Sequence, residues 1–273
     1  MTDSDSTSKF AEINGANIHY EQVGQGQDIV FVHAGIADSS MWDEQVTEFS
    51  RTLRVTRYDL RGFGRSSIPP APFTQSADLA ELFRHLGIEN AIVVGASFGG
   101  NVSADFALEH PDLISGLILV NSLVGSTAVS PELRAGWDRV NAAVAADDIE
   151  LAIEIEQQMW VDGQHRSPAQ VDPVLRERVR TMNAKIFARV AEQELAEELD
   201  LDPPANQRLH EIRVPTMVIV GDLDISDTLS SAENLVASIP NSRRETITGA
   251  AHLPSMEQPG EFNRIVHEFI RSV

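Results

Sequence analysis

The sequence predicts an α/β fold in which helices cover both faces of a mostly parallel β-sheet. Short apolar runs recur along the chain, and most of them are separated by segments with helical periodicity. Asn14-Gly15 joins the first two runs and is a strong hairpin signal, so we expect the sheet to begin with an antiparallel pair. The 273 residues, 42% of them apolar, suffice for one large core with or without an insert.

The pattern predicts eight strands and five helices around them. The expected strands span residues 10–13, 17–21, 29–33, 55–58, 91–95, 116–121, 216–221 and 243–248. The expected helices span residues 41–50, 76–86, 98–109, 228–238 and 260–270.

One region breaks the alternation. Between residues 124 and 211 we find no strand pattern, only amphipathic helical patterns at 132–145, 149–160, 173–191 and 192–199, followed by a proline-rich exit at 202–205. We therefore expect a helical cap at 124–211, inserted into a core made of 9–123 and 212–273. Residues 1–8 are polar and acidic, which predicts a disordered tail.

Composition and charge indicate which partners and which cellular compartment to expect. A net charge of −20 argues against nucleic acid, which needs a basic surface. No apolar run is long enough for a membrane helix, and the polar N-terminus is neither a signal nor a transit peptide, so we expect a cytoplasmic protein. The chain has no cysteine for disulfides or a thiolate zinc site. Oligomeric state does not follow from the sequence.

The most informative motif is Gly95-Ala96-Ser97-Phe98-Gly99, placed between an expected buried strand and an expected helix. The pattern G-x-S-x-G in this context predicts a sharp turn that exposes Ser97 Oγ as a nucleophile. Gly95 and Gly99 lack the Cβ atoms that would collide where strand and helix meet. The helix that follows favours negative charge beside the serine. The competing interpretation of Ser97 is a helix N-cap.

Four further motifs follow expected strands in a fixed order. They are His33-Ala34-Gly35-Ile36 with Trp42, the loop from Asp59 to Ser66, Gly221-Asp222-Leu223-Asp224, and Gly249-Ala250-Ala251-His252-Leu253-Pro254. Together with the G-x-S-x-G turn, they resemble the α/β-hydrolase superfamily across essentially the whole chain. The resemblance implies the α/β-hydrolase fold with a helical cap, and it matches that fold's order of serine, acid and histidine.

The resemblance assigns roles to these residues. Ser97 is the expected nucleophile, His252 the general base and acid, and Asp224 the carboxylate that orients the imidazole. Asp222 and Asp227 lie on the same loop as Asp224 and remain alternatives for the acid. The competing interpretation of His252 is a surface histidine.

The backbone N–H groups of Phe98 and Gly35 are expected to form an oxyanion hole. His33 is expected to order that loop, and Asp59 and Arg61 to hold loops by charge-assisted hydrogen bonds. Trp42, Trp137 and Trp160 are interpreted as core or insert packing. Pocket lining is the alternative for Trp137 and Trp160.

Departures from the superfamily patterns reduce the number of reaction classes that the chain is expected to catalyse. A serine at the elbow, in place of aspartate, argues against haloalkane dehalogenases and epoxide hydrolases. Leu253 stands where carbon–carbon bond hydrolases of the superfamily usually carry tryptophan. The loop His33-Ala34-Gly35 lacks a triple-glycine run and resembles that of small esterases and lactonases.

The sequence therefore predicts a cofactor-independent serine hydrolase that cleaves a small-molecule carboxylic ester or lactone through an acyl-enzyme. No cofactor or metal site is expected. A carbon–carbon bond hydrolase, a cofactor-free perhydrolase of the haloperoxidase type, and a ligand-binding member of the fold without turnover remain open alternatives.

Overall fold

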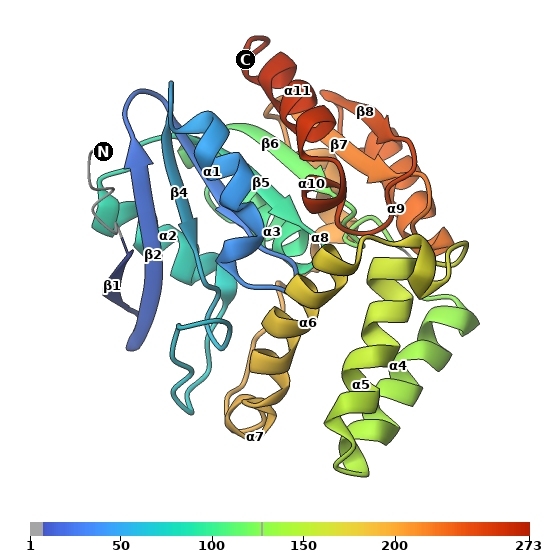
Figure 1. Cartoon of the computed structure of the whole chain (residues 1–273). Helices are drawn as coiled ribbons and strands as arrows, with labels where there is room; N and C mark the ends of the chain where they lie inside the picture. The colour runs from blue at the N-terminus through green and yellow to red at the C-terminus, as the bar shows by residue number, and fades with distance from the viewer. Residues whose placement is uncertain (1–7, 127) are drawn as a thin grey trace, which may run out of the picture.

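The fold is an eight-stranded sheet with helices on both faces (Figure 1), as the sequence predicts. The computed structural model describes residues 8–126 and 128–273. The strand order is β1-β2-β4-β3-β5-β6-β7-β8. β2 pairs antiparallel with β1 and β4, and all other neighbours are parallel. The strands are β1 (Ser8–Ile13), β2 (Ala16–Gly24), β3 (Asp28–Val32), β4 (Arg54–Tyr58), β5 (Ala91–Ala96), β6 (Ile114–Val120), β7 (Thr216–Gly221) and β8 (Ser242–Ile247).

The first two strands form the expected hairpin. Asn14 and Gly15 both have positive φ, at 46° and 79°. These values suit the tight turn that Asn-Gly favours. Ser8 is the first residue of β1 instead of the end of a tail, and the tail prediction for residues 1–7 falls outside the described residues.

Alternate residues of the central strands enter two separate cores. Phe31 and Val94 pack on the face covered by α1 (Asp43–Phe49) and α11 (Pro259–Ile270). Their neighbours Val32 and Val93 pack on the opposite face. That second face is covered by α2 (Gln75–Leu86), α3 (Phe98–Glu109) and α9 (Ser226–Ser238). Because both faces are covered, β3, β5 and β7 are buried at every position and are mostly apolar.

The chain between β6 and β7 forms a helical insert, defined here as residues 124–126 and 128–211. Its longer helices lie together beyond one end of the sheet in Figure 1. They are α4 (Pro131–Ala145), α5 (Ile149–Glu156) and α6 (Pro173–Phe187), and the short helices are α7 (Val190–Gln193) and α8 (Ala205–Arg208). α5 does not stop at residue 160 but continues as a wider π-helical turn, Gln157–Asp162.

The expected helix at 192–199 is wrong, and the helix expected at 173–191 ends at Phe187. Beyond α7 the chain makes turns up to Ala196, and residues 197–199 then pair with the loop before α2. The N–H of Phe73 donates to the Glu197 carbonyl at 3.0 Å, and the N–H of Leu199 donates to the Phe73 carbonyl at 2.8 Å. These long-range backbone bonds override the local amphipathic pattern.

Within residues 8–126 and 128–273, no helix combines the length and the apolar character needed to cross a bilayer.

Candidate active site

Ser97 occupies a sharp turn between β5 and α3. Its φ of 50° and ψ of −114° lie in a region that L-residues rarely adopt, so surrounding structure must hold it there. A Cβ on Gly99 would lie 2.4 Å from the carbonyl oxygen of Val32, which explains the glycine. The Ser97 side chain makes no capping hydrogen bond to α3. The N-cap interpretation therefore does not describe this serine.

The structure brings Ser97, His252 and Asp224 together. His252 Nε2 lies 2.8 Å from Ser97 Oγ, and His252 Nδ1 lies 2.7 Å from Asp224 Oδ2. His252 and Asp224 are each 1% exposed. A carboxylate can only accept, so Nδ1–H donates to Asp224 and Nε2 is left to accept the serine proton.

The two alternative acids point elsewhere. Asp222 Oδ1 accepts the N–H of Gly249 at 2.6 Å and bridges the loops after β7 and β8. Asp227 Oδ1 accepts the N–H of Ser130 at 2.7 Å, just before α4. Asp227 lies in the first turn of α9 and not, as expected, on the loop after β7. Of the three aspartates, Asp224 is the one that contacts the imidazole.

Asn121 joins the acid loop to the histidine loop. Its Nδ2 donates to the Ala251 carbonyl at 2.8 Å, and its Oδ1 accepts the N–H of Gly221 at 3.0 Å. The side chain is 2% exposed and follows β6 directly. Sequence reasoning missed this residue, although an asparagine at the carboxyl end of a central parallel strand was a usable signal.

The helical insert also contacts the histidine. The ring centroids of Trp160 and His252 lie 4.4 Å apart, and the N–H of His252 donates to the Trp160 carbonyl at 3.3 Å. Glu257 Oε1 accepts the N–H of Ala251 at 2.8 Å, and its Oε2 pairs with Arg166 of the insert at 2.8 Å. The insert therefore helps to fix the position of the imidazole.

Gly35 and Phe98, whose backbone N–H groups are expected to form the oxyanion hole, line the same cavity as Ser97. A Cβ on Gly35 would be 3.3 Å from the Cβ of Phe98, which brings the two residues into contact. Neither the Gly35 nor the Phe98 N–H donates to any group in the part of the chain that the structure describes. Phe98 is the first residue of α3, where backbone N–H groups lack intrahelical partners.

His33 holds the loop that carries Gly35. The N–H of Leu60 donates to His33 Nε2 at 3.0 Å, and Nδ1 donates to the Ala34 carbonyl at 2.8 Å. Burial lowers the pKa of His33, which favours the neutral ring that this bonding requires. The structural role predicted for His33 fits these contacts.

Asp59 and Arg61 also stabilise loops, as predicted. Asp59 accepts the N–H groups of Ser39 and Arg65 at 2.9 and 2.8 Å. Arg61 binds both oxygens of Asp78, at 2.6 and 2.8 Å. Such charge-assisted bonds are stronger than neutral ones.

A cavity of about 500 Å³ opens beside Ser97 and His252. Its apolar wall consists of Ile36, Phe98, Leu123, Val129, Leu133, Trp137 and Trp160. Glu156 and Asp227 add two carboxyl groups to this lining. Trp42, in contrast, is fully buried in the core.

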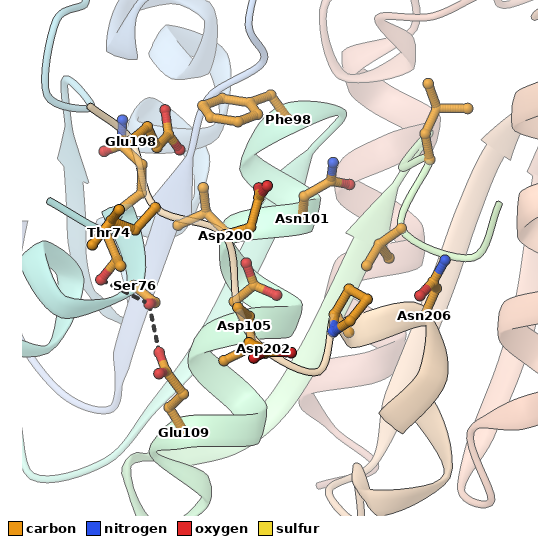
Figure 2. A pocket seen from close by; sticks show the side chains of 18 of the residues that line it. Thr74, Ser76, Phe98, Asn101, Asp105, Glu109, Glu198, Asp200, Asp202 and Asn206 are labelled. Atoms are coloured by element: carbon orange, nitrogen blue, oxygen red, sulfur yellow. Dashed lines mark hydrogen bonds between the residues drawn. The ribbon is translucent and has the colours of Figure 1, made fainter. Parts of the chain in front are cut away.

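A second cavity, of about 780 Å³, lies between α2, α3 and the segment at 198–206 (Figure 2). It shares Phe98, Asn101, Leu123 and Ser126 with the first cavity. Five carboxyl groups line it, those of Asp105, Glu109, Glu198, Asp200 and Asp202. Burial and the neighbouring carboxylates raise the pKa of Asp105 to about 7 and that of Glu198 to about 7. Across the described chain, no group of three or more acidic or histidine side chains is arranged to hold a metal ion.

Comparison with known proteins identifies the family. The model of the α/β-hydrolase fold matches residues 29–259, and the chain belongs to that family. It is 27% identical to the pimeloyl-[acyl-carrier protein] methyl ester esterase of Vibrio atlanticus, over 90% of this chain and 95% of that protein. It is 30% identical to a putative non-heme chloroperoxidase of Synechocystis sp., over 93% of this chain and 95% of that protein. The enol-lactonase of Burkholderia xenovorans has a similar structure, with a TM-score of 0.79, 27% identity, and coverage of 96% of this chain and 100% of that one.

Proposed function

We propose that the protein is a serine hydrolase that cleaves a small-molecule carboxylic ester or lactone through an acyl-enzyme. The observation that carries the proposal is the continuous contact from Asp224 to His252 to Ser97, at 2.7 and 2.8 Å. Similarity to a methyl ester esterase and an enol-lactonase supports the same bond type.

The chemistry follows from this arrangement. Ser97 Oγ attacks the substrate carbonyl carbon while its proton passes to His252 Nε2. Asp224 stabilises the imidazolium that forms. The tetrahedral intermediate then collapses: the carbon–oxygen bond to the leaving group breaks, and the leaving oxygen takes the proton from His252. A water molecule, deprotonated by His252, then attacks the acyl carbon; the bond to Ser97 Oγ breaks, Oγ takes the proton back from His252, and the acid is released.

The negative oxygen of the intermediate needs donors. The N–H groups of Gly35 and Phe98 have no acceptor in the described chain, which leaves them free for this oxygen. The positive end of α3 adds to the stabilisation. Loss of one such donor typically slows an enzyme by about 10² to 10³.

The helical insert acts as a cap over the reaction centre in this proposal. Trp137 and Glu156 of the insert line the same cavity as Ser97, and Trp160 contacts His252. The size of the cavity suits a small molecule. The acyl and alcohol parts of the substrate would bind against its apolar wall.

A fluorophosphonate probe and an ester panel test the proposal together. We expect the probe to label the wild-type protein, and Ser97→Ala to abolish both labelling and hydrolysis of p-nitrophenyl esters. A wild-type protein that is neither labelled nor able to hydrolyse any ester or lactone would refute it. Peracid formation in hydrogen peroxide or cleavage of a vinylogous diketone, each with no ester turnover, would assign the same three side chains to a different reaction.

A further inference from the structure

Glu156 is a carboxylic acid in the wall of the catalytic cavity that the proposed mechanism does not use. It is the last residue of α5 and lines the cavity together with Ser97 and His252. Its one side-chain hydrogen bond within the described chain comes from Asn183 of α6, whose Nδ2 donates to Oε2 at 2.7 Å. Asn183 is itself 1% exposed.

The hydrogen bond from Asn183 does not fully offset the burial of the charged form of Glu156. Burial raises the pKa of Glu156 to about 7, and the single bond from Asn183 offsets only part of that cost. No arginine, lysine or histidine of the described residues pairs with Glu156. Apolar residues of similar volume are often as stabilising as buried polar pairs, or more so. The contacts of Glu156 within the described chain therefore do not by themselves account for a carboxyl group at this position.

Glu154, two residues earlier on α5, shows the contrasting structural use of a glutamate. It pairs with Arg176 at 3.1 Å and accepts a hydrogen bond from Gln158 at 3.0 Å. It does not line the catalytic cavity. The two glutamates differ in partners and in the face of the helix they occupy.

Glu156 is also four residues in sequence before Trp160, which contacts His252. The π-helical turn Gln157–Asp162 begins at the next residue, and such turns are frequent at functional sites. Trp160, four residues on, contacts His252. The carboxyl group therefore lies about one helical turn from a side chain that touches the catalytic imidazole.

We propose that Glu156 is a specificity-determining residue that accepts a hydrogen bond from a donor group on the substrate, a hydroxyl, amide N–H or ammonium, and disfavours substrates that carry a carboxylate. The inference rests on the proposed hydrolase function and narrows its substrate class. The net charge of −20 and the acidic second cavity beside the catalytic one also disfavour substrates that carry a carboxylate, because both repel anions.

The test uses p-nitrophenyl esters whose acyl chains end in a methyl, hydroxyl, ammonium or carboxylate group, at several chain lengths. The quantity measured is kcat/KM for each polar ester divided by that for the methyl-ended ester of equal length. At pH 8.5, where Glu156 is mostly ionised, we expect Glu156→Gln to lower the ammonium ratio about tenfold or more and to raise the carboxylate ratio, because a charge-assisted bond is lost. The hydroxyl ratio falls less, since the Gln amide can still accept.

Glu154→Gln is the matched control, because it removes the same charge from the same helix outside the cavity. We expect it to leave all ratios unchanged. A second variant, Glu156→Leu combined with Asn183→Leu, removes both polar groups and should abolish the preference for hydroxyl-ended esters as well. A purely structural Glu156 would instead give a lower melting temperature in Glu156→Gln and no change in any ratio.

The outcomes separate this inference from the proposed function. Ester hydrolysis through Ser97 with identical ratios in wild type and Glu156→Gln, at every chain length, overturns the inference alone. Equal shifts in the Glu154→Gln control also overturn it, since they would reflect net charge only. Absence of hydrolysis of every ester by the wild-type protein overturns both proposals.

Discussion

The indole ring of Trp160 packs against the imidazole of His252, with ring centroids 4.4 Å apart. The backbone of the same tryptophan accepts the N–H of His252 at 3.3 Å. A residue of the helical insert thus contacts both the ring and the backbone of His252, the proposed base. We infer that the orientation of this imidazole depends on the insert as well as on the sheet.

Replacing Trp160 tests this dependence. We expect Trp160→Leu to lower kcat about two- to tenfold, the range expected from losing an aromatic contact. Trp137→Leu is the control: Trp137 lines the same cavity but is 38% exposed, so its loss should change KM more than kcat. Steady-state kinetics on one ester measures both, and equal kcat values in wild type and Trp160→Leu would contradict the idea.

The contacts of the two aspartates after β7 predict very different effects of substitution. Asp224→Asn removes the carboxylate that fixes the imidazole tautomer, and we expect kcat to fall about 10³- to 10⁴-fold. Asp222→Asn weakens only the bond to the Gly249 N–H, and a much smaller loss should follow. If Asp222→Asn proves the more damaging change in a kcat measurement, the acid has been assigned to the wrong residue.

The convergence of Ser97, Asp224 and His252 could be predicted because each lies in a short local sequence motif. The turn at Ser97 requires small residues at Gly95 and Gly99, and the acid and histidine each follow an apolar strand. Since the carboxyl ends of parallel strands meet at one edge, their side chains had to converge there. The hairpin at Asn14-Gly15 was equally local.

Features that depend on long-range contacts could not be predicted in this way. Asn121 and Trp160 contact residues about 100 positions away, so their strand-end place and the pocket-lining alternative could be read from the sequence but their partners could not. The helix expected at 192–199 failed because backbone bonds to Phe73 compete with local helix formation. The hydrogen bond between Glu156 and Asn183 could not be predicted, because it depends on how α5 packs against α6.

The close approach of α3 to β3 predicts a stability effect. A Cβ on Gly99 would lie 2.4 and 2.5 Å from the backbone oxygens of Val32 and His33, which cannot move independently. We expect Gly99→Ala to lower the free energy of unfolding by about 2 kcal/mol or more. Urea denaturation measures this value.

Gly260 provides the control for that substitution. It lies in α11, and a Cβ there meets nothing within 4 Å. Gly260→Ala should raise the free energy of unfolding by up to about 1 kcal/mol, because alanine favours the helix. Similar losses in both variants would mean that contact with Val32 is not the cause.

The acidic cavity predicts a dependence of stability on pH. Burial and the nearby Glu109 and Asp200 raise the pKa of Asp105 to about 7, whereas the unfolded side chain titrates near 4. The folded state therefore binds more protons between about pH 4 and 7. The stabilisation by protonated Asp105 is fully present below pH 4 and is lost as the pH rises through 7.

Asp105→Asn imitates the protonated side chain and should remove this loss. We expect the variant to be more stable than wild type by about 1–2 kcal/mol at pH 8, a value reduced for partial solvent screening, and nearly equal to it at pH 4.5. Thermal unfolding at the two pH values gives the comparison. Asp112→Asn, at an exposed position, should show no such pH-dependent gain, and a matching gain there would point to net charge instead.

Mass spectrometry of the protein quenched during turnover of a p-nitrophenyl ester tests the central claim most directly. The account predicts that the acyl group is found on the peptide containing Ser97 and that Ser97→Ala shows neither this adduct nor hydrolysis. Continued hydrolysis by Ser97→Ala at the wild-type rate, or an acyl group attached to a different residue, would contradict it.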